Sequence, residues 1–297
     1  MKALIFNSGL GRRMGAYTKF SPKSMLKLKN GETVLFRQLR ILQECNINDI
    51  IITTGPFADQ LKVCANKFQD LRVTFVENKE YDTTNAIYSF YLASKFLNDD
   101  FITLHGDLVF TSNTLKHILA DPHGSCVAVD SHKKLPEKDF KGRIVTGTVQ
   151  EISVHTFGED CVSLQPLYKI SKNDLDLWAV EVKKMVESGN KNVYAEEAFN
   201  KISTSLKLYP VDCVNYFLEE IDTPEDYQTV SNEISLIDVD EQTVLHTTED
   251  LIRYLEIKKS KNLFVVASKR SSKNPLVQIL QKRYSCTLFN NFSSNPH

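Results

Sequence analysis

The first turn of the chain concentrates glycines and cations. Gly9 and Gly11 follow a short apolar run, and Arg13 and Lys23 come shortly after them. Glycines let backbone N–H groups turn toward an anion without interference from a Cβ atom. Guanidinium and ammonium groups add positive charge at the same place, so the stretch predicts a polyphosphate-binding loop. The alternative is a glycine turn whose cations are only solvated.

The loop lacks two widespread phosphate-binding motifs. A Walker A loop needs Gly-x-x-x-x-Gly-Lys followed by Ser or Thr, and this pattern does not occur here. A dinucleotide-binding fingerprint needs a third glycine at the position of Met14. The loop therefore disfavours both P-loop NTPases and NAD-dependent dehydrogenases.

Short apolar runs bounded by turn residues predict the elements that position this loop. The predicted buried parallel strands lie at residues 3–7, 49–54, 72–77, 101–105 and 126–130. Amphipathic helices are predicted between them, at 34–45 and 85–97. This alternation predicts a doubly wound, mostly parallel α/β sheet, whose ligands bind at the carboxyl ends of its strands.

The second half of the chain changes character twice. Residues 143–163 are β-rich and predict a small antiparallel insertion, after which helices return at 175–187 and 195–202. The first domain is predicted to span residues 1–231. An acidic linker then occupies 232–248, and 249–297 predicts a partial second domain with a C-terminal β-α-β fragment.

Composition excludes several classes of partner. The 36 Lys and Arg residues nearly balance the 37 Asp and Glu residues, which argues against binding to nucleic acid or an anionic membrane. The N-terminus enters a strand directly, and no apolar run reaches the ~18 residues of a membrane span. The six cysteines are scattered, which predicts free thiols. We expect a cytoplasmic protein, and a homodimer is compatible with these features.

The N-terminal loop resembles the signature of the sugar-nucleotidyltransferase superfamily. The matching residues are Gly9-x-Gly11-x-Arg13-Met14, then Thr18-x-x-x-Pro22-Lys23-x-Met25. Family members usually carry two alanines before the first glycine, where this chain has Asn7 and Ser8. The resemblance implies a nucleotide held by Asn7, Ser8, Gly9, Leu10, Gly11, Arg13 and Lys23.

Three later segments extend the resemblance in the family's order. Residues 77–89 resemble the phosphocholine and phosphonate cytidylyltransferase branch, which implies that Thr84 and Asn85 read the base or ribose. The alternative is that this stretch only caps a helix. Gly106-Asp107 and residues 220–226 resemble the two metal-binding motifs, which implies Asp107, Asp222 and Glu220 as ligands of Mg²⁺.

The resemblance implies a Rossmann-like nucleotidyltransferase fold and transfer of CMP from CTP with release of pyrophosphate. Lys23 would stabilise charge on the α-phosphate, and Arg13 with the glycine amides would hold the leaving pyrophosphate. Asp107 and Asp222 each end an apolar run, so they can converge on one hard cation and act together with Lys23 and Arg13. The alternatives are that Asp107 caps a turn and that Asp222 caps the helix beginning at Pro224.

The acceptor is predicted to bind between the end of the strand at 126–130 and the later helices. An acid with aromatic rings can hold an aminoalkyl or choline cation, and a lysine cluster can hold a phosphonate or phosphate, although charge runs are usually solvated surface. The candidate residues are Asp130, Lys138, Lys141, Tyr194 and Glu196.

Residues 262–272 and 287–296 resemble the first β-α-β unit of iron-dependent alcohol dehydrogenases. Either this fragment packs on the first domain, or the chain is the front of a larger fusion with a dehydrogenase domain, whose product would feed the transferase. A phosphonate acceptor, 2-aminoethylphosphonate or 2-hydroxyethylphosphonate, is therefore favoured over phosphocholine. A CTP:phosphocholine cytidylyltransferase and a non-catalytic nucleotide-binding regulatory module are the alternatives.

Overall fold

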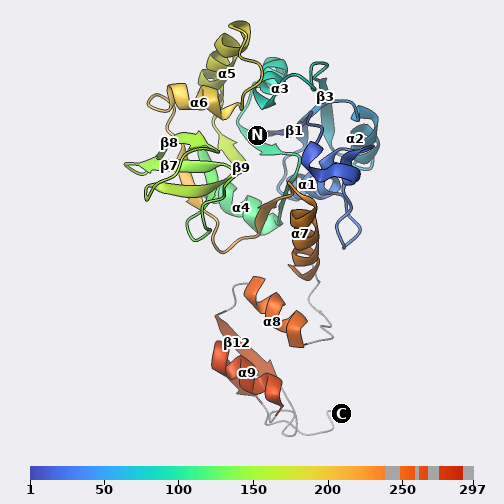
Figure 1. The fold of residues 1–297 in the computed structure, drawn as a ribbon, viewed down its shortest axis with the longest axis vertical. Helices are drawn as coiled ribbons and strands as arrows, with labels where there is room; N and C mark the ends of the chain where they lie inside the picture. The colour runs from blue at the N-terminus through green and yellow to red at the C-terminus, as the bar shows by residue number, and fades with distance from the viewer. Residues whose placement is uncertain (238–247, 258–260, 267–273, 290–297) are drawn as a thin grey trace. The chain divides into compact units, whose positions relative to one another are not determined.

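The computed structural model describes residues 1–237, 248–257, 261–266 and 274–289 of the chain (Figure 1). The chain divides into two compact units, Met1–Asn232 and Glu233–His297. The first unit contains every residue for which a binding or catalytic role is predicted.

A nine-stranded sheet forms the centre of the first unit. Seven strands make its main path: β1 (Lys2–Asn7), β2 (Asp49–Thr54), β3 (Arg72–Glu77), β4 (Phe101–His105), β6 (Cys126–Asp130), β9 (Cys161–Ile170) and β10 (Tyr209–Asp212). Their order is β10-β6-β9-β4-β1-β2-β3. β1 pairs in parallel with β2 and β4, and β2 pairs in parallel with β3. The predicted largely parallel α/β sheet is therefore confirmed.

One strand departs from the predicted parallel arrangement. β9 lies between β4 and β6 and is antiparallel to both, so β6 has no parallel neighbour on that side. β9 also extends the β-rich insertion, because β7 (Lys141–Val145) pairs with it and with β8 (Thr148–Ser153). A ten-residue strand, almost wholly buried, fills the position that a parallel crossover strand would take.

Helices cover both faces of the sheet (Figure 1). One face carries α1 (Val34–Glu44), α2 (Ala58–Ala65) and α4 (Ser112–Ala120), and the other carries α3 (Ala86–Ala93), α5 (Lys172–Glu187) and α6 (Glu196–Ile202). Short 3₁₀ segments lie at Arg12–Thr18 (η1), Lys23–Met25 (η2) and Ser94–Phe96 (η3). The helix predicted at 85–97 is therefore an α-helix that ends in a 3₁₀ turn.

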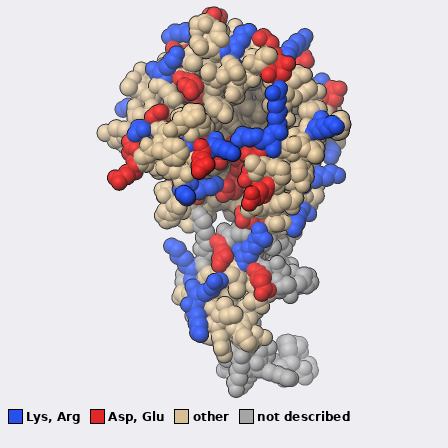
Figure 2. All heavy atoms as spheres, viewed as in Figure 1, with Lys and Arg blue, Asp and Glu red and all other residues tan. Residues whose placement is uncertain are grey.

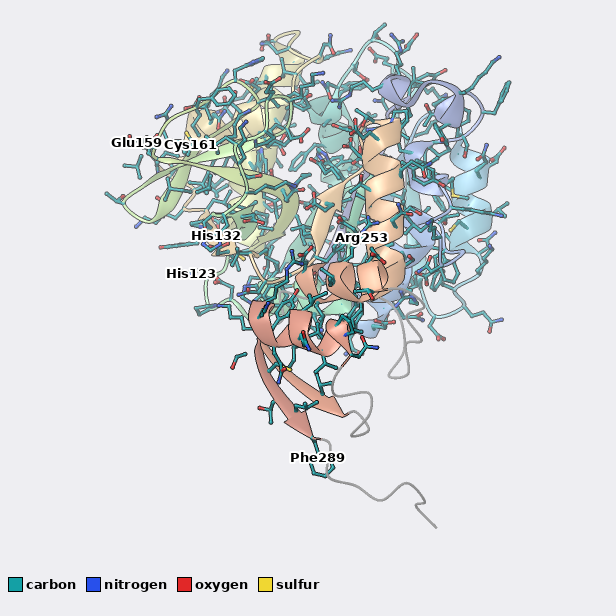
Figure 3. The ribbon with its side chains drawn as sticks, turned by 60° about the horizontal axis from the view of Figure 1, so that its bottom comes forward. His123, His132, Glu159, Cys161, Arg253 and Phe289 are labelled. Atoms are coloured by element: carbon teal, nitrogen blue, oxygen red, sulfur yellow. The ribbon has the colours of Figure 1, made fainter. Side chains whose placement is uncertain are left out.

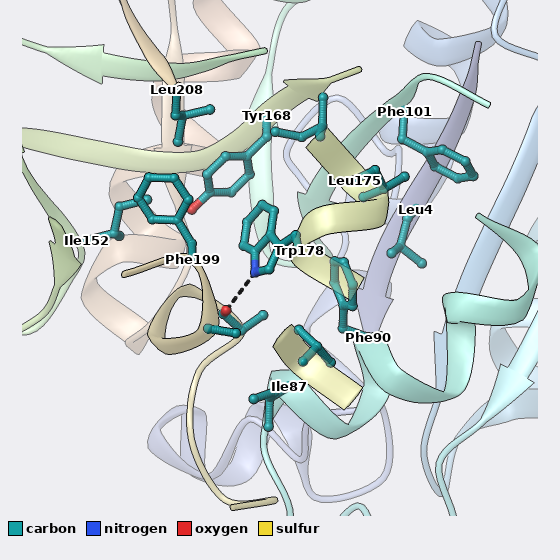
Figure 4. Close-up of a cluster of buried hydrophobic side chains, with 14 of the residues drawn as sticks. Leu4, Ile87, Phe90, Phe101, Ile152, Tyr168, Leu175, Trp178, Phe199 and Leu208 are labelled. Carbon is teal, nitrogen blue, oxygen red and sulfur yellow. Dashed lines mark hydrogen bonds between the residues drawn. The ribbon is translucent and has the colours of Figure 1, made fainter. Parts of the chain in front are cut away.

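Trp178 joins three helices on one face of the sheet (Figure 4). Its ring centroid lies 5.5 Å from that of Phe90 on α3 and 5.8 Å from that of Phe199 on α6. The indole N–H donates to the carbonyl oxygen of Ala195 at 2.9 Å, which satisfies the one polar atom of the ring. This packing fixes the chain segment just before α6, which contains Tyr194.

A two-stranded antiparallel sheet connects distant parts of the first unit. β5 (Leu108–Phe110) pairs with β11 (Leu218–Glu220), and Leu108 is the partner of Glu220. The N–H of Ile221 then donates to the carbonyl oxygen of Asp107 at 3.0 Å. Two sequence-distant acidic segments are thereby held side by side.

The second unit contains a β-α-β arrangement. α8 (Thr248–Ile257) comes first, followed by β12 (Asn262–Val266), α9 (Pro275–Arg283) and β13 (Ser285–Phe289). β12 and β13 pair in parallel, as the pattern of residues 249–297 predicted. α7 (Pro224–Ile237) runs past the predicted boundary at 231, so residues 232–237 are helical instead of linker. The remainder of the predicted linker, 238–247, and the residues 267–272 and 290–296 of the dehydrogenase-like stretch lie outside the described residues.

Candidate active site

A pocket of about 350 Å³ opens where the carboxyl ends of β1 and β4 meet the N-terminal loop. Figure 2 shows a face of the first unit that is hollowed where side chains of both charges meet. The pocket is bordered by the loop after β1, by the segment before α3 and by the residues that follow β4. Its position is the one that doubly wound sheets offer to ligands.

The glycine loop needs Gly11 for two reasons. Its φ of 61° lies in the left-handed region that glycine adopts without strain. A Cβ atom there would also lie 2.8 Å from Cγ of Lys23. The hydroxyl of Thr18 donates to the carbonyl oxygen of Gly11 at 2.8 Å and closes the loop. Gly9, Gly11, Arg13 and Lys23 all border the pocket, whereas Leu10 does not.

Lys23 lies between two of the three carboxylates predicted as metal ligands. Its Nζ atom is 2.9 Å from Oδ2 of Asp107 and also contacts Oδ1 of Asp222. Arg13 reaches the same group, with Nη2 2.9 Å from Oδ2 of Asp222. The structure thus brings Asp107 and Asp222 together at one cation, as their positions after two apolar runs predicted.

Asp222 does not cap the helix that follows it. The hydroxyl of Thr223 accepts from the N–H of Asp226 at 3.2 Å, and Asp226 Oδ2 accepts from the N–H of Thr223 at 2.7 Å. This reciprocal pair satisfies the start of α7. The carboxylate of Asp222 is therefore left facing Arg13 and Lys23.

The charges of this cluster stabilise one another. Burial alone would lower the pKa of Lys23, but Asp107 and Asp222 raise it well above its usual range. Burial alone would raise the pKa of Asp107, but Lys23 and His105 lower it below its ordinary value. Lys23 is therefore an ammonium and Asp107 a carboxylate at neutral pH.

Glu220 and His105 form a second pair beside this cluster. Nδ1 of His105 lies 3.7 Å from Oε1 of Glu220. Burial, and then the charges of Asp107 and Asp222, raise the pKa of Glu220 to about 7, although His105 opposes the shift. Burial lowers the pKa of His105, but Glu220 and other carboxylates together raise it to about 9.

The donor set fits a hard divalent cation. His105, Asp107 and Glu220 each offer a ligand atom, and these atoms lie within 4.8 Å of one another. Asp107 and Asp222 already enclose the monovalent ammonium of Lys23. Two carboxylates that leave room for phosphate oxygens and water match the preference of Mg²⁺. His123 and His132, labelled in Figure 3, do not border the pocket.

Thr84 and Asn85 border the pocket and also make local hydrogen bonds. Asn85 is the N-cap of α3, because its Oδ1 accepts from the N–H of Ala86 at 2.7 Å. The hydroxyl of Thr84 donates to the carbonyl oxygen of Glu80 at 2.7 Å. Capping and pocket lining therefore coexist at Asn85.

The predicted acceptor residues separate into two groups. Lys138 and Tyr194 border the pocket, whereas Asp130, Lys141 and Glu196 do not. Asp130 is the last residue of β6, and its Oδ1 accepts from the backbone N–H groups of His132 and Lys133 in the turn that follows. Asp130 and Lys141 form hydrogen bonds away from the pocket, and Glu196 contacts Tyr168. Their acceptor roles stay predictions that the pocket lining does not support.

Lys141 and Glu196 are buried. Nζ of Lys141 donates to the carbonyl oxygens of Pro136 at 2.6 Å and Val154 at 2.7 Å. Glu196 on α6 accepts from the hydroxyl of Tyr168 on β9 at 2.8 Å. Lys141 therefore does not reach the pocket, although its neighbour Phe140 borders it.

Two residues that border the pocket were not predicted from the sequence. Asp139 and Phe140 border the pocket directly before β7. Burial, and then the charge of Asp222 and a hydrogen bond to it, raise the pKa of Asp139. The Phe140 ring meets the ring of Tyr194 edge-on at 4.9 Å. The signal was present, because an acid and an aromatic residue adjoin Lys138 in the sequence.

Residues 3–191 match the family model described as MobA-like NTP transferase domain. The chain belongs to this family. Among curated relatives, this MobA-like NTP transferase is 35% identical over 113 residues to the choline-phosphate cytidylyltransferase of Haemophilus influenzae, covering 38% of this chain and 46% of that protein. It is 28% identical over 146 residues to the CMP-5'-(3-aminopropyl)phosphonate synthase of Streptomyces rubellomurinus, covering 49% of this chain and 22% of that protein.

The MobA-like NTP transferase thus spans about half or less of the length of these curated relatives. A solved structure of CTP:phosphocholine cytidylyltransferase from Streptococcus pneumoniae shares its fold, with a TM-score of 0.62 and 20% identity. That match covers 78% of this chain and 98% of the other. Within the described residues, no helix has the length and apolar character needed to cross a bilayer.

Proposed function

We propose that this chain is a cytidylyltransferase that joins CMP from CTP to a small phosphonate and releases pyrophosphate. The observation that carries the proposal is the enclosure of Lys23 by Asp107 and Asp222 beside a glycine loop. The family relationship and the activities for which the relatives are named support the same class of reaction.

The reaction brings two anions together. An oxygen of the acceptor phosphonate attacks the α-phosphorus of CTP and forms a new P–O bond. The bond between the α-phosphorus and the bridging oxygen breaks, and pyrophosphate leaves with the electron pair. A dianionic acceptor has no proton to lose, so the protein's task is to neutralise charge and align the reactants.

The cations of the site have distinct parts in this proposal. Lys23, which is nearly buried, stabilises the charge that develops on the α-phosphate. Arg13 is half exposed at the mouth and holds the leaving pyrophosphate with the amides of Gly9 and Gly11. Phosphate oxygens thereby replace carboxylate oxygens as the partners of these two cations.

Mg²⁺ is the proposed cofactor, held by Asp107 and Asp222, with Glu220 beside them. When bound, the ion supplies Lewis acidity at the α-phosphate and screens the incoming anion. Displacement of the Lys23 ammonium from between the carboxylates would free both for the ion and direct the lysine toward the nucleotide. The support for this is the chemistry of the donor set and its enclosure of a cation.

The acceptor is placed at the end of the pocket formed by Lys138, Asp139, Phe140 and Tyr194. Lys138 provides positive charge for the phosphonate. Asp139 with the two rings provides an acidic and aromatic lining for an ammonium group, which supports 2-aminoethylphosphonate. The sequence resemblance of residues 262–272 and 287–296 to a dehydrogenase is the reason for proposing 2-hydroxyethylphosphonate as the other acceptor.

Phosphocholine is the second candidate acceptor. The same lining of Asp139, Phe140 and Tyr194 suits a quaternary ammonium group, and relatives are named as choline-phosphate cytidylyltransferases. The phosphonate remains the proposed acceptor because of the second unit.

Steady-state kinetics with CTP and each of the three acceptors test this assignment. We expect a higher kcat/KM for one of the two phosphonates than for phosphocholine. If phosphocholine is favoured by tenfold or more, a difference of about 1.4 kcal/mol in transition-state binding, the phosphonate assignment is wrong. If CTP binds but no acceptor leads to pyrophosphate release, the chain is a non-catalytic nucleotide-binding module and not a cytidylyltransferase.

A further inference from the structure

One part of the pocket is lined by uncharged polar groups. It lies between the end of β1 and the start of α3, and we call it the polar floor. Its members are Ser8, Asn78, Tyr81, Thr84, Asn85 and Ser89. Phosphates need positive charge, which Arg13 and Lys23 provide elsewhere in the pocket. Hydroxyl and amide groups beside an aromatic ring instead suit a nucleobase, which is neutral and presents hydrogen-bonding edges.

The amide of Asn78 has a fixed orientation in the polar floor. Its Oδ1 accepts from the backbone N–H of Glu80 at 2.9 Å, which a flipped amide could not do. Its Nδ2 therefore donates, to Oγ1 of Thr84 at 3.0 Å and to Oγ of Ser89 at 3.2 Å. Asn78 is 2% exposed, so water does not compete for these bonds.

This orientation sets the direction of a chain of hydroxyl groups. Ser89 accepts from Asn78, and its own proton is donated to Oγ of Ser8 at 3.0 Å. The hydroxyl proton of Ser8 then has no acceptor among the described residues, although Ser8 borders the pocket and is 8% exposed. Thr84 differs, because its proton is already donated to the carbonyl oxygen of Glu80.

Ser8 therefore has a proton to donate to the ligand, while its oxygen accepts from Ser89 and keeps one further lone pair. A reversal would require Ser89 to accept from both Ser8 and Asn78 while its own proton lost its partner, at a cost typical of an unsatisfied buried polar group. Cytosine and uracil differ at ring atom N3, which is a hydrogen-bond acceptor in cytosine and carries a hydrogen in uracil. If the Ser8 proton faces N3, it forms a hydrogen bond with cytosine. With uracil it would have no acceptor at N3, which disfavours that base.

We propose that the Ser8 hydroxyl, oriented by the Asn78–Ser89 relay, donates to N3 of the base and selects cytosine over uracil. This inference rests on the proposed function and names the side chain that sets its nucleotide choice. It also gives a role to a serine at a position where related sequences usually carry alanine.

Calorimetric titration of the full chain with CTP and with UTP, in the presence of Mg²⁺ and without acceptor, tests the proposal. In Ser8→Ala we expect CTP affinity to fall about tenfold, the effect of one hydrogen bond of about 1.4 kcal/mol. UTP affinity should change by less than about twofold. In Ser89→Ala the Ser8 hydroxyl is free to turn, so UTP affinity should rise relative to that of CTP.

Thr83→Ala is the matched control, because it removes an exposed hydroxyl from the same loop that does not border the pocket. Its ratio of CTP to UTP affinity should equal that of the wild type. Equal losses for both nucleotides in Ser8→Ala would overturn the proposal. Selective binding of CTP without pyrophosphate release in any acceptor assay would overturn the proposed enzyme while still supporting the role of Ser8.

Discussion

Lys23 is the residue on which the chemistry of the site depends most. It is held by two carboxylates that come from segments far apart in the chain, and both contacts raise its pKa. Once the nucleotide is bound, a lysine placed beside the α-phosphate stabilises the charge that develops there without further reorganisation during the chemical step. The side chain lies at the pocket wall and makes little contribution to the hydrophobic core.

Replacement of Lys23 by Ala should reduce kcat by about 10²–10³, the usual effect of losing one preorganised charge donor. The circular dichroism spectrum should stay that of the wild type. Lys27→Ala offers a control from the same loop region, because Lys27 does not border the pocket. A kcat within a few fold of the wild type in Lys23→Ala would exclude the assigned role.

Asp222→Asn should change the response to metal as well as the rate. A neutral amide is a poor ligand for Mg²⁺, so a higher concentration of the ion should be needed for half-maximal activity. Asp226→Asn is the control, because Asp226 caps α7 next to the site without bordering the pocket. An unchanged Mg²⁺ dependence in Asp222→Asn would show that this carboxylate does not hold the ion.

At the scale of elements, the pairing of β5 with β11 brings the acidic residues together. This pairing sets Leu108 opposite Glu220, so Asp107 and Asp222 extend from neighbouring strand ends. The opposite wall of the pocket depends on the segment before β7. There the ammonium of Lys141 joins the carbonyl oxygens of Pro136 and Val154, and so ties Lys138, Asp139 and Phe140 to the insertion.

Lys141→Met should loosen this wall while preserving most of its packing. We expect the KM of the acceptor to rise about tenfold, the loss of a charged hydrogen bond, with the KM of CTP within about twofold of the wild type. Lys169→Met is a matched control: Lys169 is also buried and donates to a carbonyl oxygen, that of Asp121, but does not border the pocket. Equal changes in both KM values would indicate a general loss of structure.

The sequence predicts those parts of the site that follow from strand ends. Apolar runs locate β1 and β4, so the glycine loop and Asp107 could be placed at one sheet edge before the structure was known. Asp130 and Lys141 could not be placed, because their directions depend on a turn after β6 and on the pairing of β7 with β8 and β9. β9 was missed between β4 and β6 because its long-range antiparallel pairing leaves no local signal.

At the scale of the whole molecule, all proposed site residues belong to the unit Met1–Asn232. Both hydrophobic clusters of the described residues also lie within it. The second unit has its own parallel strand pair and helix. Nucleotide transfer should therefore depend on the first unit together with all of α7.

A chain ended after Ile237, which retains α7, should fold and transfer CMP with a kcat/KM within a few fold of that of the full chain. Thermal unfolding and pyrophosphate release would be measured side by side for both proteins. A soluble, folded shorter chain without activity would show that the second unit contributes directly to the site.

The most direct measurement is ³¹P nuclear magnetic resonance of the full chain with CTP, Mg²⁺ and 2-aminoethylphosphonate. The proposed reaction predicts a new P–O–P linkage, with a phosphonate resonance coupled to that of CMP, and one equivalent of pyrophosphate for each equivalent of product. The same mixture with 2-hydroxyethylphosphonate would identify the preferred acceptor. Release of inorganic phosphate without a coupled phosphonate signal, or CTP left intact with every acceptor, would contradict the assignment as a cytidylyltransferase.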